Sequence, residues 1–176
     1  QQGIADCLST LGNVASDQGD YASADDLLGR SLTLCRIAKD ELGLANALAS
    51  LGHVAERQGR FDMAWELYEE SLAIRLKQGD QQGVAASFDN LGLVAQRQGR
   101  CAVARERLEQ SVKISRELRD QQGIAASLNN LGNVACDEGK HEEARDLLGQ
   151  SLALCQKLGD QRGIATALGN LGNVAW

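Results

Sequence analysis

Asparagine side chains recur at fixed spacing in this sequence, and their chemistry suits contact with another polypeptide. The phrase LNNLGNVA at residues 128–135 carries three of them, and related phrases begin at residues 8, 48, 88 and 168. An asparagine amide has both a hydrogen-bond donor and an acceptor. A row of such amides can therefore satisfy the backbone N–H and C=O groups of an extended peptide.

Two columns of the repeated phrase hold these amides. One column reads Asn13, His53, Leu93, Asn133 and Asn173, and the other reads Thr10, Ser50, Asn90, Asn130 and Asn170, with Asn129 beside it. The candidate partner-binding residues are therefore Asn13, His53, Asn90, Asn129, Asn130, Asn133, Asn170 and Asn173. The alternative is a solvated polar surface on which asparagines bond to neighbouring helices, and the sequence leaves both interpretations open.

Two arginines extend this set of candidates. Arg57 and Arg97 occupy equivalent positions, 40 residues apart. Two guanidinium groups can together hold a carboxylate of an acidic ligand. The alternative is an ion pair with Glu56 or Asp89, and the two interpretations have equal support from the sequence.

The remaining polar residues do not form a catalytic pattern. Ser31, Ser71, Ser111 and Ser151 recur once in each repeat. A catalytic nucleophile is not copied into every repeat, so small packing residues are the better interpretation. No phosphate-binding loop, pair of acids or Ser/His/Asp set is present, and we expect no enzymatic activity.

The cysteines indicate neither disulfides nor metal. There are five of them, none in a CxxC spacing: Cys7, Cys35, Cys101, Cys136 and Cys155. An odd number without ligand spacing favours reduced thiols in a cytoplasmic protein. We therefore expect no metal site and no cofactor.

The net charge argues against two classes of partner. The chain carries a formal charge of −6 at pH 7. Nucleic acids and anionic membranes both require a basic surface to neutralise their phosphates. In addition, no apolar run approaches the ~18 residues that span a bilayer. We therefore expect neither a nucleic acid nor a membrane as partner.

The elements that position these residues follow from a period of 40 residues. The stripe Ile4, Leu8, Leu11 and Ala15 predicts an amphipathic helix, and a second stripe from Ala24 to Cys35 predicts another. Gly19 separates the two, so they form an antiparallel hairpin. One hairpin cannot bury both of its faces, and stacked hairpins predict an α-solenoid.

Two repeated residue types mark the helix ends and the helix contacts. Asp40, Asp80, Asp120 and Asp160 precede predicted helices, where an aspartate can cap free N–H groups. Gly79 and Gly159 stand before two of them and suit a left-handed helix stop. Gly132 and its equivalents lie inside the first helix, where glycine costs about 1 kcal/mol relative to alanine. Close approach of the partner helix would offset that cost.

These residues resemble the tetratricopeptide repeats. The resemblance rests on Leu8, Leu11, Gly12 and Ala15 in the first helix, on Gly19 and Tyr21 at the turn, and on Ala24, Leu28 and Ser31 in the second helix. The usual proline is missing, and a unit of 40 residues exceeds the typical length of about 34. Lengthened units of this kind resemble those of kinesin light chain, Pins-type adaptors and bacterial signalling arrays.

The resemblance implies a right-handed superhelix of helix hairpins whose first helices line a concave groove. It implies a non-catalytic scaffold that binds an extended peptide of a partner there. Two alternatives stay open: a regulatory or sensor segment of a larger signalling protein, and a self-associating structural array.

We expect one array over residues 1–176. Its repeats are 1–40, 41–80, 81–120 and 121–160, followed by a half repeat at 161–176. The array is expected to be a piece of a longer protein. The half repeat carries Ile164, Leu168, Leu171, Val174 and Trp176 without a partner helix. Self-association through this apolar end is therefore a further expectation.

Overall fold

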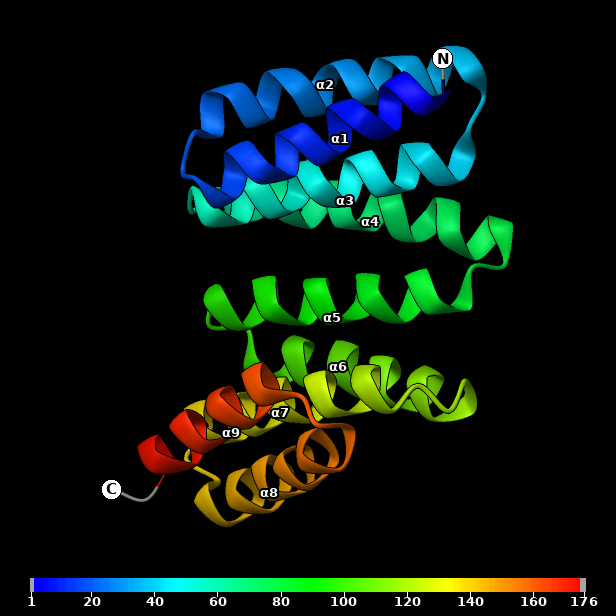
Figure 1. Cartoon of the computed structure of the whole chain (residues 1–176). Helices are drawn as coiled ribbons and strands as arrows, with labels where there is room; N and C mark the ends of the chain where they lie inside the picture. Colours follow the sequence, from blue (N-terminus) through cyan, green and yellow to red (C-terminus); the bar gives the residue numbers. More distant parts are fainter. Residues whose placement is uncertain (1, 175–176) are drawn as a thin grey trace. The chain divides into compact units, whose positions relative to one another are not determined.

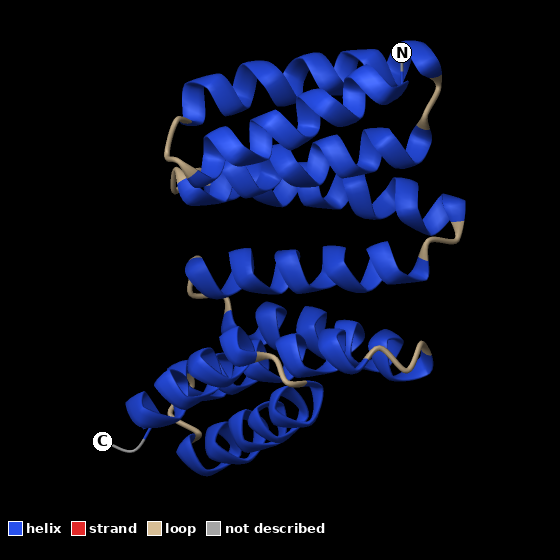
Figure 2. Cartoon of the chain, viewed as in Figure 1, coloured by secondary structure: helices blue, strands red, loops and turns tan. Residues whose placement is uncertain are grey.

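The computed structural model describes residues 2–174, and all regular structure in that range is helical. Figure 1 labels the helices in chain order and Figure 2 shows loops only between them. The helices are α1 (Gln2–Asp17), α2 (Tyr21–Ala38), α3 (Glu41–Arg57), α4 (Phe61–Gln78), α5 (Gln81–Arg97), α6 (Cys101–Glu117), α7 (Gln121–Asp137), α8 (His141–Leu158) and α9 (Gln161–Val174). Each repeat contributes a first helix, with an odd number, and a second helix, with an even number.

The chain divides into two compact units, Gln1–Gly83 and Val84–Trp176. In the first unit, α1 packs on α2 and α3 packs on α4, and α2 also contacts α3. In the second unit, α7 packs in the same way on α8, and α6 and α8 contact the first helices that follow them. The predicted antiparallel hairpins are therefore present in both units. That the two units continue one array stays a prediction.

Aspartates start four of the first helices, as predicted. The carboxylates of Asp40, Asp80, Asp120 and Asp160 each accept a hydrogen bond of 2.9–3.0 Å from the backbone N–H three residues later. That N–H belongs to a glycine in each case. The negative carboxylate also lies at the positive end of the helix dipole, which adds to the stability of the helix start.

The short segment after each second helix contains one residue in the left-handed conformation, which directly follows α2, α4 and α8 and lies two residues after the end of α6. Gly79 and Gly159 have φ angles of 72° and 71°, as predicted for helix stops. Lys39 and Arg119 occupy the equivalent positions with φ angles of 55° and 58°. A side chain with a Cβ adopts this conformation at a cost, so these two stops are less favourable than the glycine stops.

The glycine inside each first helix from α1 to α7 is a point of close helix contact. A Cβ built on Gly132 would lie 2.6 Å from Cγ of Leu148, and one on Gly52 would lie 2.7 Å from the ring of Tyr68. Neither distance is sterically possible without displacement of the neighbour. Gly172, in the half repeat, has nothing within 4 Å. The predicted packing role of this glycine is therefore confirmed in the repeats whose second helix is present in the structure.

Alanine and leucine side chains form the core between consecutive hairpins. In the first unit, buried Ala24 and Leu28 of α2 cluster with Val54 of α3. In the second unit, Ala144 and Leu148 of α8 cluster in the same way with Val174 of α9. The repeat period thus reproduces the same contact in each unit.

The serine of each second helix is buried and hydrogen-bonded. Hydroxyls of Ser31, Ser71 and Ser151 donate to the carbonyl oxygens of Ala5, Ala45 and Ala125 over 2.7–2.8 Å. Ser111 instead bonds the hydroxyl of Ser127 over 2.9 Å. The bonds of Ser31, Ser71 and Ser151 tie the two helices of a hairpin together, whereas the bond of Ser111 links α6 to α7 of the next repeat. Both kinds of contact fit the structural role expected from the sequence.

Candidate functional site

Three of the candidate asparagines bond neighbouring first helices in the second unit. Asn130 Nδ2 donates to Oδ2 of Asp89 over 3.0 Å, and Asn170 Nδ2 donates to Oδ1 of Asn129 over 3.0 Å. Gln96 and Asp137 form a similar bond between α5 and α7. These contacts match the alternative interpretation of the asparagine columns. They leave Asn130 Oδ1 and Asn129 Nδ2 without a hydrogen bond in the described part of the chain.

The other candidate polar residues are open to contact. Asn13, His53 and Asn173 are exposed, and Asn90 and Asn133 are half-buried. Within residues 2–174 none of their side chains makes a hydrogen bond. These side chains retain the donors and acceptors that a bound peptide would need.

The two candidate arginines are both exposed but differ in their contacts. Arg57 donates from Nε to the hydroxyl of Tyr21 over 3.4 Å, and its guanidinium lies 6.0 Å from the centre of that ring. Glu56 instead accepts a hydrogen bond from Tyr68. The ion pair considered for Arg57 is thus replaced by an aromatic contact. Arg97 makes no ion pair in the described part of the chain.

Asp89 of α5, which accepts the hydrogen bond from Asn130, has a perturbed carboxyl group. Burial raises the pKa of its carboxyl from 3.8 to about 6, against opposing hydrogen bonds from Ser127 and Asn130. Its second oxygen, Oδ1, is buried without a hydrogen-bond partner. Burial of a charged carboxylate with an unsatisfied oxygen destabilises the folded state, and protonation of the carboxylate reduces that destabilisation.

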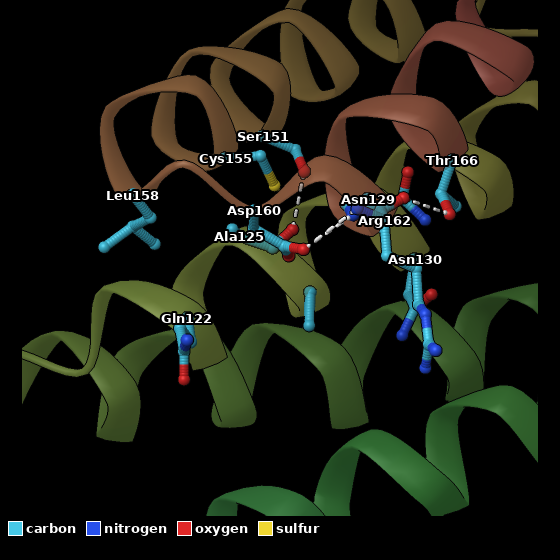
Figure 3. A pocket seen from close by; sticks show the side chains of 12 residues that line it. Gln122, Ala125, Asn129, Asn130, Ser151, Cys155, Leu158, Asp160, Arg162 and Thr166 are labelled. Carbon is cyan, nitrogen blue, oxygen red and sulfur yellow. Dashed lines mark hydrogen bonds between the residues drawn. The ribbon is translucent and has the colours of Figure 1, made fainter.

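A pocket of about 240 Å³ lies between α7, the end of α8 and the start of α9. Figure 3 shows Ser151 and Cys155 extending from α8 toward Ala125 and Asp160, with Asn129 and Asn130 on α7. Small side chains form its interior, and polar side chains surround it. The full lining is Gln122, Ala125, Ala126, Asn129, Asn130, Ser151, Cys155, Leu158, Asp160, Arg162, Gly163 and Thr166.

The charged groups of this pocket are one acid and one base. Asp160 Oδ1 accepts from the backbone N–H groups of Arg162 and Gly163, over 3.1 and 3.0 Å. Asp160 Oδ2 makes no hydrogen bond in the described part of the chain. The Arg162 side chain is exposed and, within the same residues, forms no ion pair. The pocket can therefore accept a polar side chain of a size comparable to one amino acid.

The sequence predicts only part of this pocket. It indicates Asn129 and Asn130 as candidates for partner binding, whereas it predicts Asp160 as a helix cap, Ser151 as a packing residue and Cys155 as a reduced thiol. One signal was available: the column of Cys155 reads Cys35, Arg75, Ser115 and Cys155, with a single long side chain among small ones. Whether space is left beside a small residue depends on the side chains that pack around it in the fold. A comparison of equivalent repeat positions does not show this.

The described residues also bear on metal binding and on membrane insertion. Residues 2–174 bring no three His, Cys, Asp or Glu side chains together in a way that could hold a metal ion. None of the described helices combines the length and apolar character needed to cross a bilayer.

A family model described as Tetratricopeptide repeat matches residues 3–77, 43–117 and 123–176. The chain belongs to the tetratricopeptide repeat family. A comparison with curated protein sequences finds no match.

Solved structures share the tetratricopeptide fold at low sequence identity. BtubC (BKLC) from P. vanneervenii matches with a TM-score of 0.85 and 23% identity, over 98% of this chain and 72% of that one. The nearly identical TPR-like repeats of a putative kinesin light chain from Podosopora anserina match with a TM-score of 0.77 and 22% identity, over 99% and 86%. The predicted all-α tetratricopeptide solenoid is thus confirmed as the fold class.

A third similar structure contains a bound partner. It is a Rap protein complexed with Competence and Sporulation Factor, with a TM-score of 0.85 and 17% identity. The match covers 95% of this chain and 46% of that one. Tetratricopeptide repeats are in general protein–protein interaction scaffolds and typically non-catalytic, which is the coarse function that family membership gives this chain.

Proposed function

We propose that this chain is a non-catalytic scaffold that binds an extended peptide segment of a partner protein along its first helices. The observation that carries the proposal is the pocket between α7 and α9, because Asn129 and Asn130 line it. The pocket volume of about 240 Å³ suits one side chain of such a peptide. Amides along the same helices would bond the peptide backbone.

The proposal assigns roles to all the candidate residues. Asn13, His53, Asn90, Asn133 and Asn173 have unused hydrogen-bonding groups, so they are the first candidates for backbone contacts. Asn129, Asn130 and Asn170 would act with the atoms that their helix-to-helix bonds leave unused. Arg57 and Arg97 would pair with acidic side chains. The similar Rap protein, which was solved as a complex with Competence and Sporulation Factor, gives general support. A cytoplasmic setting is part of the proposal.

The test begins with selection of peptides from a random displayed library on the wild-type chain. Affinities of the selected peptides are then compared by fluorescence anisotropy with the double variant Asn129→Ala plus Asn133→Ala. We expect at least about a tenfold loss of affinity, since each lost hydrogen bond to an uncharged group is worth about 1 kcal/mol.

The matched control is Asp146→Ala plus Gln150→Ala, which removes two exposed polar side chains of α8 that bond each other. This control should retain wild-type affinity. Equal affinity of the asparagine variant and the wild type would remove the support for binding along the first helices.

A second proposal is self-association through the half repeat. Leu168 of α9 is 52% exposed, although the equivalent Leu48 and Leu128 are buried. Exposed apolar surface of this kind favours association. Trp176, which the sequence predicts to contribute, lies outside the described residues.

A further inference from the structure

The second repeat shows what fills the position of the pocket when a long side chain is present. Arg75 is the residue equivalent to Cys155, 80 positions earlier. Its Nη1 donates to Asp80 Oδ2 over 2.6 Å and its Nη2 donates to Asn46 Oδ1 over 2.6 Å. Nε donates to the hydroxyl of Ser71 over 3.3 Å. The side chain is 13% exposed, so this guanidinium is largely enclosed by its acceptors.

The fourth repeat keeps two of these acceptors. Ser151 is equivalent to Ser71, and Asp160 is equivalent to Asp80. Both line the pocket, in which the short side chain of Cys155 takes the position of the arginine. The carboxylate oxygen that pairs with Arg75 in the second repeat corresponds to Asp160 Oδ2, which has no hydrogen bond in the described part of the chain.

A third acceptor comes from a different residue. Asn46 is equivalent to Ala126, which cannot accept a hydrogen bond. Asn130 lines the same pocket, and because its nitrogen donates to Asp89, its oxygen is the atom left to accept. The fourth repeat therefore again offers a carboxylate, a hydroxyl and an amide oxygen, which match the donors of a guanidinium.

We propose that this pocket binds the guanidinium of an arginine side chain from the partner. The inference rests on the proposed function, since it names one side chain of the bound peptide. The partner's arginine would pair with Asp160 Oδ2 and donate to Ser151 and Asn130, as Arg75 does with its own neighbours. Arg162, exposed at the edge of the pocket, has the same charge as the ligand and weakens binding without blocking it.

The test uses small probes, so that it does not depend on finding the natural peptide. N-acetyl-arginine amide, its neutral analogue N-acetyl-citrulline amide and N-acetyl-glutamate amide are titrated into isotope-labelled protein. Amide chemical shifts of Asn130, Ser151 and Gly163 report occupation of the pocket. We expect saturable shifts with the arginine probe, at least about tenfold weaker binding of citrulline, and no saturable shift with glutamate.

Substitutions in the pocket test whether the arginine probe binds there. Cys155→Arg places the chain's own guanidinium in the pocket, and we expect the arginine probe to lose at least about tenfold in affinity. The matched control is Cys35→Arg, the same change in the other unit, which should bind as wild type. Asp160→Asn retains a helix-capping residue but removes the charge, and should weaken binding about threefold to tenfold. Arg162→Gln should strengthen it.

The outcomes separate this inference from the proposed function. Equal binding of arginine and citrulline probes, preferred binding of glutamate, or wild-type affinity in both Cys155→Arg and Asp160→Asn would overturn the arginine assignment. Circular dichroism of each variant establishes that the helices are intact. A library peptide that is lost with the asparagine variant but retained with Cys155→Arg would support peptide binding and reject the arginine pocket.

Discussion

Gly132 shows at the residue scale why a poor helix former recurs inside the first helices. Its missing side chain allows Leu148 to approach, and the carbonyl oxygen of Ala144 lies 3.4 Å from where a Cβ would be. Glycine costs about 1 kcal/mol in helix propensity. The close contact with α8 is the compensating gain.

Gly132→Ala should therefore destabilise the protein by about 1–3 kcal/mol, because overpacking outweighs the improved propensity. Gly149→Ala is the matched control: it lies in the facing helix α8, and a Cβ there would meet nothing within 4 Å. That change should stabilise the protein by up to about 1 kcal/mol. Urea unfolding measures both, and equal effects of the two substitutions would refute the packing role.

Asp89, also at the residue scale, makes the stability of the folded protein depend on pH. Its folded pKa of about 6 lies above the usual 3.8, so the folded state binds a proton more tightly than the unfolded state. The associated stabilisation is fully present below about pH 4 and is lost as the pH rises through 6. Asp89→Asn copies the neutral pair of Asn129 and Asn170 found 40 residues later.

The substitution Asp89→Asn should therefore stabilise the protein by about 1–3 kcal/mol at pH 7.5 and by much less at pH 4. Urea unfolding of both proteins at several pH values gives this difference directly. A difference that does not change with pH would mean that Asp89 does not titrate in this range.

At the element scale, the helix stops are not equivalent. Lys39 and Arg119 adopt the left-handed conformation that Gly79 and Gly159 adopt without a Cβ. Lys39→Gly and Arg119→Gly should each stabilise the protein by about 0.5–1 kcal/mol, since a Cβ in this conformation costs roughly 1–2 kcal/mol and glycine loses more entropy.

The reverse substitution Gly79→Lys provides the internal control and should destabilise the protein by about 1 kcal/mol. Thermal unfolding followed by circular dichroism is sufficient to rank the three variants. If Lys39→Gly destabilised the protein, the lysine side chain would stabilise the helix end by more than its left-handed backbone conformation destabilises it.

At the scale of the whole molecule, the proposed self-association through the half repeat can be tested by one substitution. Leu168→Lys should abolish any rise in mass with concentration, because it places a charge on the exposed apolar surface of α9. Ile37→Lys is the control, since Ile37 is also exposed, at 62%, but lies on α2. Light scattering over a range of concentrations measures the mass. A wild-type monomer at every concentration would reject self-association.

The sequence by itself determined the helices, their pairing into hairpins and their starts. These features depend on residues close in the chain: an apolar stripe with helical spacing, a three-residue link such as 18–20, and an aspartate that reaches an N–H three residues away. Because the sequence has a period of 40 residues, the same helices, links and caps recur in each repeat. For the same reason the family and the fold class could be predicted.

Only the tertiary structure decided how the polar side chains are used. The sequence around Asn129 and Asn130 does not show whether their amides are free to bind a ligand. In the structure, each of them bonds a residue 41 positions away. The pocket beside Cys155 exists because α8, α7 and α9 place small side chains around it. Such contacts depend on packing between consecutive hairpins, which a column of equivalent residues does not encode.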